Sequence, residues 1–364
     1  MPALSPSAES INHCSLLRHS KLLLQTPELV IIFALVAFLC LFSYHSSSFG
    51  PFPVSYTKHH NSSVNGTMDL KSILKKAATS NNTVIVTTLN DAWAEPNSVF
   101  DLFLESFRTG NQTQKLLNHL VVVAWDQKAY TRCLKLHTHC YNLSTGVDFS
   151  EEAYYMAPDY LNMMWRRTNF LRNVVDLGYN FLFTDADIMW FRDPFPHFHE
   201  DGDFQIACDY FNGNPIDLNN LPNGGFIYVK SNNKTIQFYK YWCDSKLTYP
   251  GLNEQDVFNK IKYGPFIRDN GLQMRFLDTV FFGGFCEPSR DFDKVCTMHA
   301  NCCVGLENKV RDLGILLKDW RKYMNSFVNR TSLLGSWTVP QSCRGSLQRP
   351  RAPRKKNDHH DGKN

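Results

Sequence analysis

The sequence lacks the cysteine spacing of a zinc ribbon or a thioredoxin-type redox site, because no Cys-x-x-Cys pair occurs among its 11 cysteines. Eleven cysteines in 364 residues are also too few and too scattered for a small disulfide scaffold. No internal repeat is present. The chain instead holds 43% hydrophobic and 13% aromatic residues, which is enough for a folded core, so we expect one large domain with appendages.

An excess of charge of either sign is missing from most of the chain. Residues 344–364 carry seven Lys or Arg against two Asp or Glu, and the other 343 residues carry 31 basic against 32 acidic side chains. A neutral body does not indicate a nucleic-acid-binding surface, and we expect no nucleic-acid partner. Residues 341–364, which are rich in Arg, Pro, Lys and His, are expected to form a disordered basic tail.

Charged side chains are absent from residues 29–44, an apolar run that reaches the length of a membrane-spanning helix when extended back through residues 22–24. Arg18 and Lys21 precede the run, whereas the next basic residue after it is Lys58. This asymmetry favours a cytosolic tail at 1–28 and a retained signal anchor that holds the chain in a membrane. A cleaved signal peptide competes with this interpretation, but the run starts late and lacks a clean small-residue cleavage pattern. A buried soluble helix is disfavoured because no polar face interrupts the run.

The residues after the apolar run have the marks of a secreted or lumenal chain. Nine cysteines lie there, where an oxidising compartment would preserve disulfides. Cys133 and Cys140 are expected to close a small loop, Cys302 and Cys303 to bridge elsewhere, and an odd total leaves at least one thiol unpaired. All seven Asn-x-Ser/Thr glycosylation acceptors also follow the run, at Asn61, Asn65, Asn81, Asn111, Asn142, Asn233 and Asn329.

The order of apolar runs predicts an α/β domain. Residues 45–82 are poor in apolar side chains and are expected to form a flexible stem that contains a short helix at 68–78. The folded domain is expected at 83–340, where short buried strands alternate with helices, which indicates a parallel, doubly wound sheet. The expected strands are 83–89, 120–124, 180–184, 204–208, 226–229 and 274–277, and the expected helices are 97–108, 159–178, 233–246 and 254–262.

The helix expected at 159–178 has two distinct faces at helical spacing. Gly178 is the expected residue just past its end. One face is apolar and should pack on the sheet; it holds Leu161, Met164, Trp165, Thr168, Leu171 and Val175. The other face is polar; it holds Asn162, Arg166, Asn169, Asn173 and Asp176.

Two carboxylates, Asp185 and Asp187, follow the buried strand expected at 180–184. In extended backbone, residues two apart point the same way, so both side chains can face one ion at the sheet edge where open α/β sheets bind ligands. Oxygen ligands without a neighbouring Cys or His favour Mg²⁺ or Mn²⁺ over zinc. An Asp-x-Asp pair alone is a weak signal, but its place after a strand in a chain with a predicted membrane anchor strengthens the metal-site interpretation.

Four motifs together resemble the plant nucleotide-diphospho-sugar transferase family, glycosyltransferase family 77. The resemblance spans residues 83–324 and implies a single-pass type II Golgi membrane protein. It also implies a lumenal domain of the GT-A fold, a Rossmann-like, mostly parallel sheet flanked by helices. The motifs are Asp185-Ala-Asp-Ile-Met-Trp-Phe-Arg-Asp-Pro-Phe195, Asn223-Gly-Gly-Phe226, Asn253-Glu-Gln-Asp256 and His299-Ala-Asn-Cys-Cys-Val-Gly-Leu-Glu-Asn-Lys309.

The resemblance implies roles for residues in each motif. Asp185, Asp187 and His299 would hold the cation, and the imidazole makes Mn²⁺ a better guess than Mg²⁺. Arg166 and Arg167 are weaker candidates for holding phosphate, since a surface role explains them equally well. The expected contacts with the nucleotide, diphosphate and sugar are Thr88, Asn90, Asn223, Gly224, Gly225, Glu254, Gly305 and Lys309.

Relatives of this kind look like retaining enzymes, for which two routes remain open. Asp256 is the candidate nucleophile of a double displacement, whereas Gln255 or a backbone carbonyl would stabilise positive charge in same-face attack. Acidic residues in the first turn of a helix also stabilise the helix dipole, so helix capping explains this segment equally well.

The expected activity is metal-dependent transfer of a sugar from a nucleotide-diphosphate sugar, with a UDP-sugar preferred, to a cell-wall polysaccharide or glycoprotein. Two other hypotheses stay open: a lumenal metal-dependent phosphoesterase, and a non-catalytic lumenal protein that binds sugar nucleotides. A phosphoesterase usually holds two metals and needs more grouped carboxylate and His ligands than the sequence offers.

Overall fold

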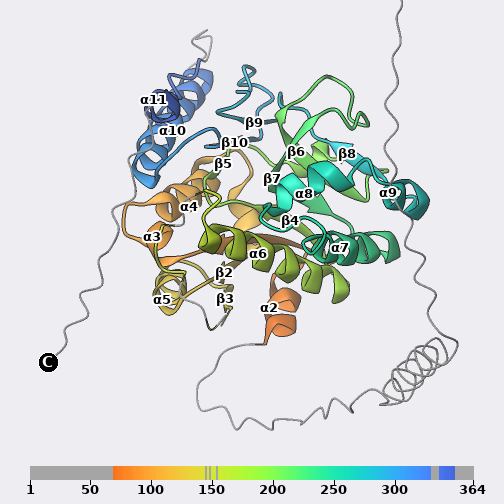
Figure 1. Cartoon of the computed structure of the whole chain (residues 1–364). Helices are drawn as coiled ribbons and strands as arrows, with labels where there is room; N and C mark the ends of the chain where they lie inside the picture. The colour runs from red at the N-terminus through yellow and green to blue at the C-terminus, as the bar shows by residue number, and fades with distance from the viewer. Residues whose placement is uncertain (1–68, 144–145, 147–148, 153–154, 329–335, 349–364) are drawn as a thin grey trace, which may run out of the picture. The chain divides into compact units, whose positions relative to one another are not determined.

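The computed structural model describes residues 69–143, 146, 149–152, 155–328 and 336–348 (Figure 1). All of these residues belong to one compact unit that begins at Asn65. The expected cytosolic tail, the apolar run at 29–44 and residues 45–68 of the expected stem lie outside the described residues. Within the described part of the chain, no helix is long and apolar enough to cross a bilayer.

A seven-stranded sheet, in the order β3-β2-β1-β4-β7-β6-β8, forms the centre of the unit (Figure 1). Strands β3, β2, β1 and β4 are parallel, β7 runs antiparallel to both of its neighbours, and β8 is parallel to β6. The strands are β1 (Thr83–Leu89), β2 (Leu120–Ala124), β3 (Cys140–Asn142), β4 (Asn180–Thr184), β6 (Phe204–Tyr210), β7 (Leu221–Val229) and β8 (Met274–Phe276).

The antiparallel strand β7 is a departure from the parallel, doubly wound sheet that the alternation of strands and helices predicts. The chain passes from β6 to β7 through the loop at 211–220, which contains no helix. Parallel neighbours need a crossover connection, whereas antiparallel neighbours can be joined by a loop. The sheet is therefore mixed, with a mostly parallel arrangement that agrees with the fold class expected from the resemblance.

A smaller three-stranded sheet, in the order β5-β10-β9, is built from β5 (Ile188–Trp190), β9 (Phe282–Gly284) and β10 (Thr297–His299). Strand β10 is antiparallel to β5, with His299 opposite Ile188, and parallel to β9. Because β5 follows β4 after three residues, this pairing brings the end of β10 beside the end of β4.

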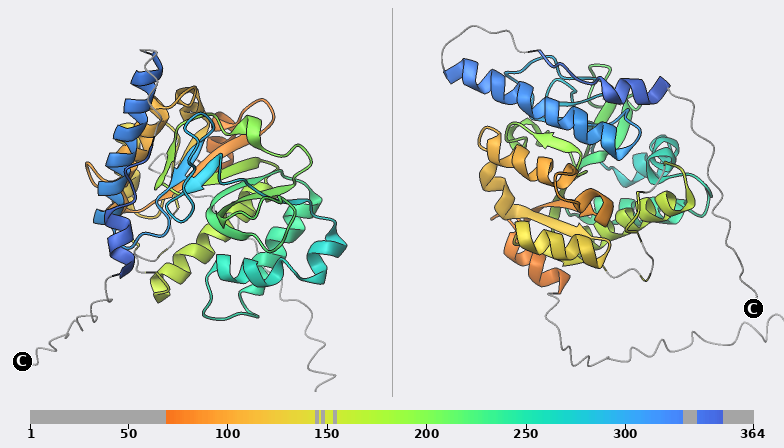
Figure 2. Two further views of the ribbon diagram at one scale, coloured as in Figure 1. Left: turned by 90° about the horizontal axis from the view of Figure 1, so that it is seen from above. Right: turned by 90° about the vertical axis from the view of Figure 1, so that its left-hand side faces the viewer.

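Helices cover both faces of the main sheet. Alternate residues of β1 point to opposite faces: Val84 and Val86 pack with α2, α6, α7 and α8, whereas Ile85 packs with α4, α5 and α10. Figure 2 shows α10 as the long blue helix on the side of the unit where α4 lies. The helices are α2 (Leu70–Ala77), α3 (Asp91–Ala94), α4 (Val99–Thr109), α5 (Gln127–Leu136), α6 (Pro158–Asp176), α7 (Asn233–Ser245), α8 (Glu254–Ile261), α9 (Pro265–Asn270), α10 (Leu306–Val328) and α11 (Ser342–Gln348), with 3₁₀ turns at Gln114–His119 and Phe195–His197.

Three disulfides are present in the described unit; one is the Cys133–Cys140 pair expected from the sequence, and the other two supply the partners of Cys302 and Cys303, which the sequence left open. Cys133 bonds to Cys140, and the neighbours Cys302 and Cys303 bond to Cys286 and Cys343 respectively. Cys208, Cys243 and Cys296 are free thiols.

The C-terminal boundary differs from the expectation of a disordered tail from residue 341. Residues 342–348 form α11, which the Cys303–Cys343 disulfide attaches to the segment before α10. The Asp312 carboxylate accepts hydrogen bonds from the backbone N–H groups of Ser342 and Cys343 and so caps the start of α11. The ordered chain therefore extends past residue 340, because covalent and capping contacts offset the low apolar content of this segment.

Candidate functional site

The two aspartates lie in a tight turn between β4 and β5. The Asp185 N–H donates to the Gly225 carbonyl at 2.7 Å, and the Ile188 N–H donates back to the Asp185 carbonyl at 3.2 Å. The expectation of an extended Asp-x-Asp is thus corrected: the carboxylates converge because the backbone turns, which reverses the chain into β5.

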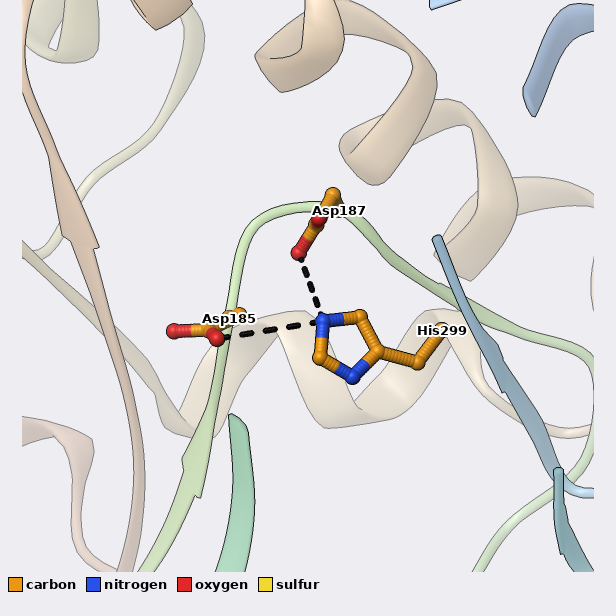
Figure 3. Close-up of side chains that lie close together, drawn as sticks. All are labelled: Asp185, Asp187 and His299. Carbon is orange, nitrogen blue, oxygen red and sulfur yellow. Dashed lines mark ion pairs between the residues drawn. The ribbon is translucent and has the colours of Figure 1, made fainter. Parts of the chain in front are cut away.

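His299 faces both aspartates from the end of β10 (Figure 3). Its Nε2 lies 3.1 Å from Asp187 Oδ1 and 3.9 Å from Asp185 Oδ2. One ligand atom from each of the three residues lies within 4.8 Å of the other two. The Ala300 N–H donates to the Asp187 carbonyl at 3.0 Å. This backbone hydrogen bond holds the end of β10 against the turn that carries Asp185 and Asp187, which we call the aspartate turn.

A basic side chain donates to the carboxylate oxygen of each aspartate that does not face His299. Arg167 on α6 donates from Nη1 to Asp185 Oδ1 at 2.8 Å. Lys309 on α10 donates from Nζ to Asp187 Oδ2 at 2.5 Å and to the Ala300 carbonyl at 3.0 Å. This division leaves Asp185 Oδ2 and Asp187 Oδ1 facing the imidazole, and Asp187 Oδ1 is buried without a hydrogen bond from another described residue.

The charges of the cluster shift the pKa values of its members. Burial alone would raise the pKa of Asp187, but Lys309 and His299 outweigh it and hold that pKa well below its usual range. Burial raises the pKa of Asp185 despite its pairing with Arg167. Burial would lower the pKa of His299, but the two aspartates raise it.

Arg167 also bridges the aspartate turn to Glu254, the first residue of α8. Its Nη2 donates to Glu254 Oε1 at 2.6 Å, and both side chains are buried. Burial raises the pKa of Glu254, and Glu254 Oε2 has no hydrogen-bond partner among the described residues. Arg167 was only a weak candidate from the sequence, because a surface role explained it equally well; its burial between two carboxylates from other elements rules out that surface role.

Gly225 on β7 lies against the cluster. A Cβ at this position would lie 2.5 Å from His299 Cε1 and 2.7 Å from Asp185 Oδ2. Only a residue without a Cβ therefore fits while the ligand atoms keep their positions. The neighbouring motif residues fix the turn: the Gly225 N–H donates to Asn223 Oδ1 at 2.9 Å, and the Gly224 N–H donates to Gln255 Oε1 at 2.7 Å.

Asp209, near the end of β6, is a member of the site that the sequence analysis missed. Its Oδ1 accepts hydrogen bonds from Asn223 Nδ2 at 2.9 Å and Asn301 Nδ2 at 2.7 Å. Asp209 therefore connects the segment that carries Gly225 to the segment that carries His299. Burial raises its pKa, against the opposing effect of His299 and the two carboxamides. Its place at the end of a buried strand, which also marks Asp185, is the signal that could have identified it.

A cavity of about 260 Å³ adjoins the cluster. Four of the residues expected to bind substrate line it, and Gly305 does so with a left-handed φ of 89°. The aromatic lining, which no sequence pattern indicated, gives the cavity apolar walls beside a charged end. The lining residues are Thr88, Asn90, Trp93, Trp125, Glu152, Tyr155, Tyr160, Met163, Met164, Arg167, Asp185, Ala186, Cys303, Val304, Gly305 and Lys309.

Two of the sequence candidates make structural contacts as well. The Asn90 side chain accepts from the Trp93 N–H at the start of α3 and donates to the carbonyls of Phe149 and Glu151 at 3.0 Å. Asp256 does not line the cavity, and its N–H is capped by Asn253 Oδ1 at 2.7 Å. Burial raises the pKa of Tyr155, a residue of the cavity wall, and the negative charge of Asp256 raises that pKa further.

The chemistry of the donor set suits a divalent cation. Two carboxylate oxygens and one imidazole nitrogen converge, and oxygen-rich sites with a single histidine accept cations such as Mn²⁺ or Mg²⁺. The buried Asp187 Oδ1, which pairs with His299 Nε2 but accepts no hydrogen bond from a described residue, is an acceptor that a cation would satisfy, and Gly225 places no Cβ against the ligand atoms. No other group of three such ligands is present in the described residues.

Comparisons with known proteins place the chain in a family. A family model described as nucleotide-diphospho-sugar transferase matches residues 115–313, more than half of the chain. An uncharacterized protein of Arabidopsis thaliana is 50% identical over 302 residues, which cover 82% of this chain and 79% of the relative. A UDP-D-xylose:L-fucose alpha-1,3-D-xylosyltransferase of Arabidopsis thaliana is 24% identical over 244 residues, which cover 60% of this chain and 67% of the relative.

The crystal structure of mouse xyloside xylosyltransferase 1 in its apo form overlays with a TM-score of 0.36 at 12% identity, covering 60% of this chain and 98% of that one. The family match and the 50% identical relative confirm the resemblance drawn from the four sequence motifs. The chain therefore belongs to the nucleotide-diphospho-sugar transferase family and is a glycosyltransferase.

Proposed function

We propose that this glycosyltransferase moves a sugar from a UDP-sugar to a polysaccharide or glycoprotein acceptor, with a divalent cation, Mn²⁺ before Mg²⁺, at Asp185, Asp187 and His299. Several relatives are named as transferases of xylose or galactose from a UDP-sugar, which supports the choice of nucleotide. The GT-A fold expected from the resemblance forms part of the same proposal.

The observation that carries the proposal is the convergence of three ligand atoms within 4.8 Å at the edge of a cavity. A cation bound there supplies charge that stabilises the departing diphosphate. Lys309 reaches the same point and provides a second positive charge for the phosphate oxygens. Gly305, just before α10, lines the cavity without a Cβ, so the backbone at this point can lie close to a ligand.

We further propose that transfer retains the anomeric configuration. Gln255 Oε1 is held by the Gly224 N–H, close to the aspartate turn, and this position suits stabilisation of an oxocarbenium-like state. Asp256, as a nucleophile, belongs to the competing double displacement. Intact-protein mass spectrometry during turnover, with Asp256→Ala as the comparison, distinguishes the two routes, because only the double displacement forms a glycosyl-enzyme and depends on the Asp256 carboxylate.

The proposed location is the Golgi membrane, with the folded domain in the lumen and residues 29–44 as a type II anchor. Three disulfides among the described residues and seven glycosylation acceptors support passage through the secretory pathway. Protection of the folded domain from protease in sealed microsomes, together with a mass shift on glycosidase treatment, tests this location.

The activity is tested with the full-length chain purified in detergent. We expect Mn²⁺-dependent glycosidic product or slow UDP-sugar hydrolysis, and a loss of about 100-fold or more in Asp187→Asn, because the cation and Lys309 both rely on this carboxylate. Asp269→Asn, at an exposed ion pair on α9, serves as the matched control.

Unchanged activity in Asp187→Asn would contradict the proposal. Release of sugar phosphate in place of a glycosidic product would identify a phosphoesterase. Binding of UDP and Mn²⁺ without turnover over a broad panel of donors and acceptors would identify a non-catalytic binding protein.

A further inference from the structure

We call the cavity of about 260 Å³ beside the aspartates the donor cavity. A second cavity, of about 340 Å³, lies on a different face of α6. The two cavities share no residue, although both use α6 as a wall. We call it the α6–α7 cavity, because most of its lining lies on α6 and at the C-terminal end of α7. Leu143, the residue after β3, completes the lining. Its lining residues are Leu143, Trp165, Arg166, Asn169, Phe170, Asn173, Cys243 and Lys246.

Polar groups along α6 form one edge of the α6–α7 cavity. Arg166, Asn169 and Asn173 are spaced by three and four residues, so they lie in a row on one helix face. Asn169 and Asn173 are exposed, and neither carboxamide hydrogen-bonds to another described residue. The row is part of the polar face of α6 that the transfer reaction leaves unused.

The floor of the cavity is apolar. Phe170 and Trp165 are 2% and 5% exposed, so each contributes an edge to the floor, and Leu143 adds an aliphatic side chain. The Trp165 Nε1–H is already donated to the Leu252 carbonyl at 3.0 Å. The Lys246 ammonium lies 5.8 Å from the Trp165 ring centroid, above this floor.

The described lining carries two positive side chains, Arg166 and Lys246, and no acidic one; the Arg166 Nε–H already donates to Asn162 Oδ1 at 3.0 Å. Asp176 and Asp244 lie outside the lining, although their charges help burial to raise the pKa of Cys243; Arg172, which pairs with Asp176 at 3.5 Å, opposes them. Among the described residues, Lys246 therefore gives the lining a positive charge that favours an anionic ligand.

We propose that the α6–α7 cavity binds a uronate-bearing segment of the acceptor glycan. Paired carboxamides can donate to and accept from neighbouring sugar hydroxyls, a cation can pair with the carboxylate, and an apolar floor can contact the C–H face of a sugar ring. A volume of about 340 Å³ lies within the range of small-ligand cavities. The proposal rests on the proposed function in one respect, because it takes the occupant to be part of the acceptor.

The test uses a matched pair of sugars and the full-length chain in detergent. Cellobiouronic acid and cellobiose differ in one carboxylate, and ligand-observed NMR at low ionic strength measures the binding of each. We expect cellobiouronic acid to bind more tightly, and to protect Cys243 from maleimide in peptide mass spectrometry, since this thiol lines the cavity. Tetraglutamate serves as an acidic peptide probe.

The charge-reversal variant Lys246→Glu is expected to weaken binding of cellobiouronic acid by about fivefold or more. Lys240→Glu, an exposed cation on α7 outside the lining, is the matched control and is expected to change nothing. Thermal melting of both variants checks that the fold is intact.

Equal binding of cellobiose, binding unchanged by Lys246→Glu, no protection of Cys243, or stronger protection by tetraglutamate would each overturn the proposal. Titration of UDP with Mn²⁺ on the same samples tests the proposed function separately, because UDP is expected at the donor cavity. Loss of glycan binding with UDP binding intact refutes only the glycan site, and the reverse result refutes only the donor site.

Discussion

At the scale of single residues, the site depends on how the oxygens of each carboxylate are shared. Arg167 and Lys309 each hold one oxygen of an aspartate, and the remaining oxygens face His299. Without these basic side chains, the half-buried Asp185 carboxylate and the buried Asp187 carboxylate would repel each other and resist ionisation. The ligand set is therefore preorganised by residues that are not themselves ligands.

Gly225→Ala tests the close approach of β7 to the ligands. Its Cβ would lie 2.5 Å from His299 Cε1, so the imidazole or the Asp185 carboxylate must move. We expect a loss of about 100-fold or more in transfer activity with only a small change in melting temperature. Gly314→Ala is the control, since a Cβ there meets nothing within 4 Å; it should stabilise α10 by about 0.5–1 kcal/mol and leave activity unchanged. Equal activity of the two variants would refute the steric argument.

Arg167→Met tests the buried bridge between the aspartate turn and α8. The change leaves Asp185 and Glu254 without their shared cation, and we expect a loss of about 3–5 kcal/mol in the free energy of unfolding, measured by urea denaturation. Adding Glu254→Gln removes one uncompensated charge and should recover part of the loss. Strictly additive losses in the double variant would argue against the bridge.

At the scale of elements, backbone pairing brings the site together. The turn after β4 places β5 beside β10, and this pairing delivers His299 to the aspartates across 112 residues of sequence. Helices α6 and α10 then supply Arg167 and Lys309 from opposite faces of the main sheet. The edge strand β3 and its neighbour β2 lie beside a pH-sensitive contact of their own.

Acid is expected to weaken the β2–β3 edge through His137, whose Nε2 lies 2.7 Å from the Leu120 carbonyl. Burial lowers the pKa of His137, with help from His139 and Arg108, so below about pH 6.5 the unfolded chain binds more protons than the folded chain. The free energy of unfolding should therefore fall as pH drops from about 6.5 toward the lowered pKa. In His137→Gln, which keeps a donor, urea denaturation over this range should show a shallower pH slope; an identical slope would contradict the assignment.

At the scale of the whole molecule, disulfides connect segments that are distant in sequence. Cys303 lines the donor cavity, and its bond to Cys343 holds α11 against the segment that leads into α10. The Cys133–Cys140 bond closes a much shorter loop, from α5 to β3. Loop length should decide how much each bond contributes to stability.

Removal of the Cys303–Cys343 bond by a double change to Ala should cost about 4 kcal/mol in the free energy of unfolding, since it closes a 40-residue separation. The same change at Cys133 and Cys140, separated by seven residues, should cost about 2.5 kcal/mol. Denaturant unfolding under non-oxidising, non-reducing conditions compares the two variants, and a larger loss for the shorter loop would refute the chain-entropy argument.

The sequence by itself determined the parts of the protein that depend on local pattern. Apolar runs located the strands 83–89, 120–124 and 180–184, and helical periodicity located the helix at 158–176 to within two residues. The four family motifs identified the glycosyltransferase family, and the Asp-x-Asp after a strand located the candidate metal site. These features can be read from sequence because strand burial, helix amphipathicity and strand-end carboxylates each involve residues close together in the chain.

Tertiary structure decided the features that depend on which strands and helices become neighbours. The antiparallel insertion of β7, the burial of Arg167 between two carboxylates and the role of Asp209 arise from contacts across 18 to 92 residues. No local pattern encodes such contacts, because the partners are brought together only when the sheet forms. The same holds for the α6–α7 cavity, whose polar row was visible in the sequence but whose floor and facing lysine required the packed helices.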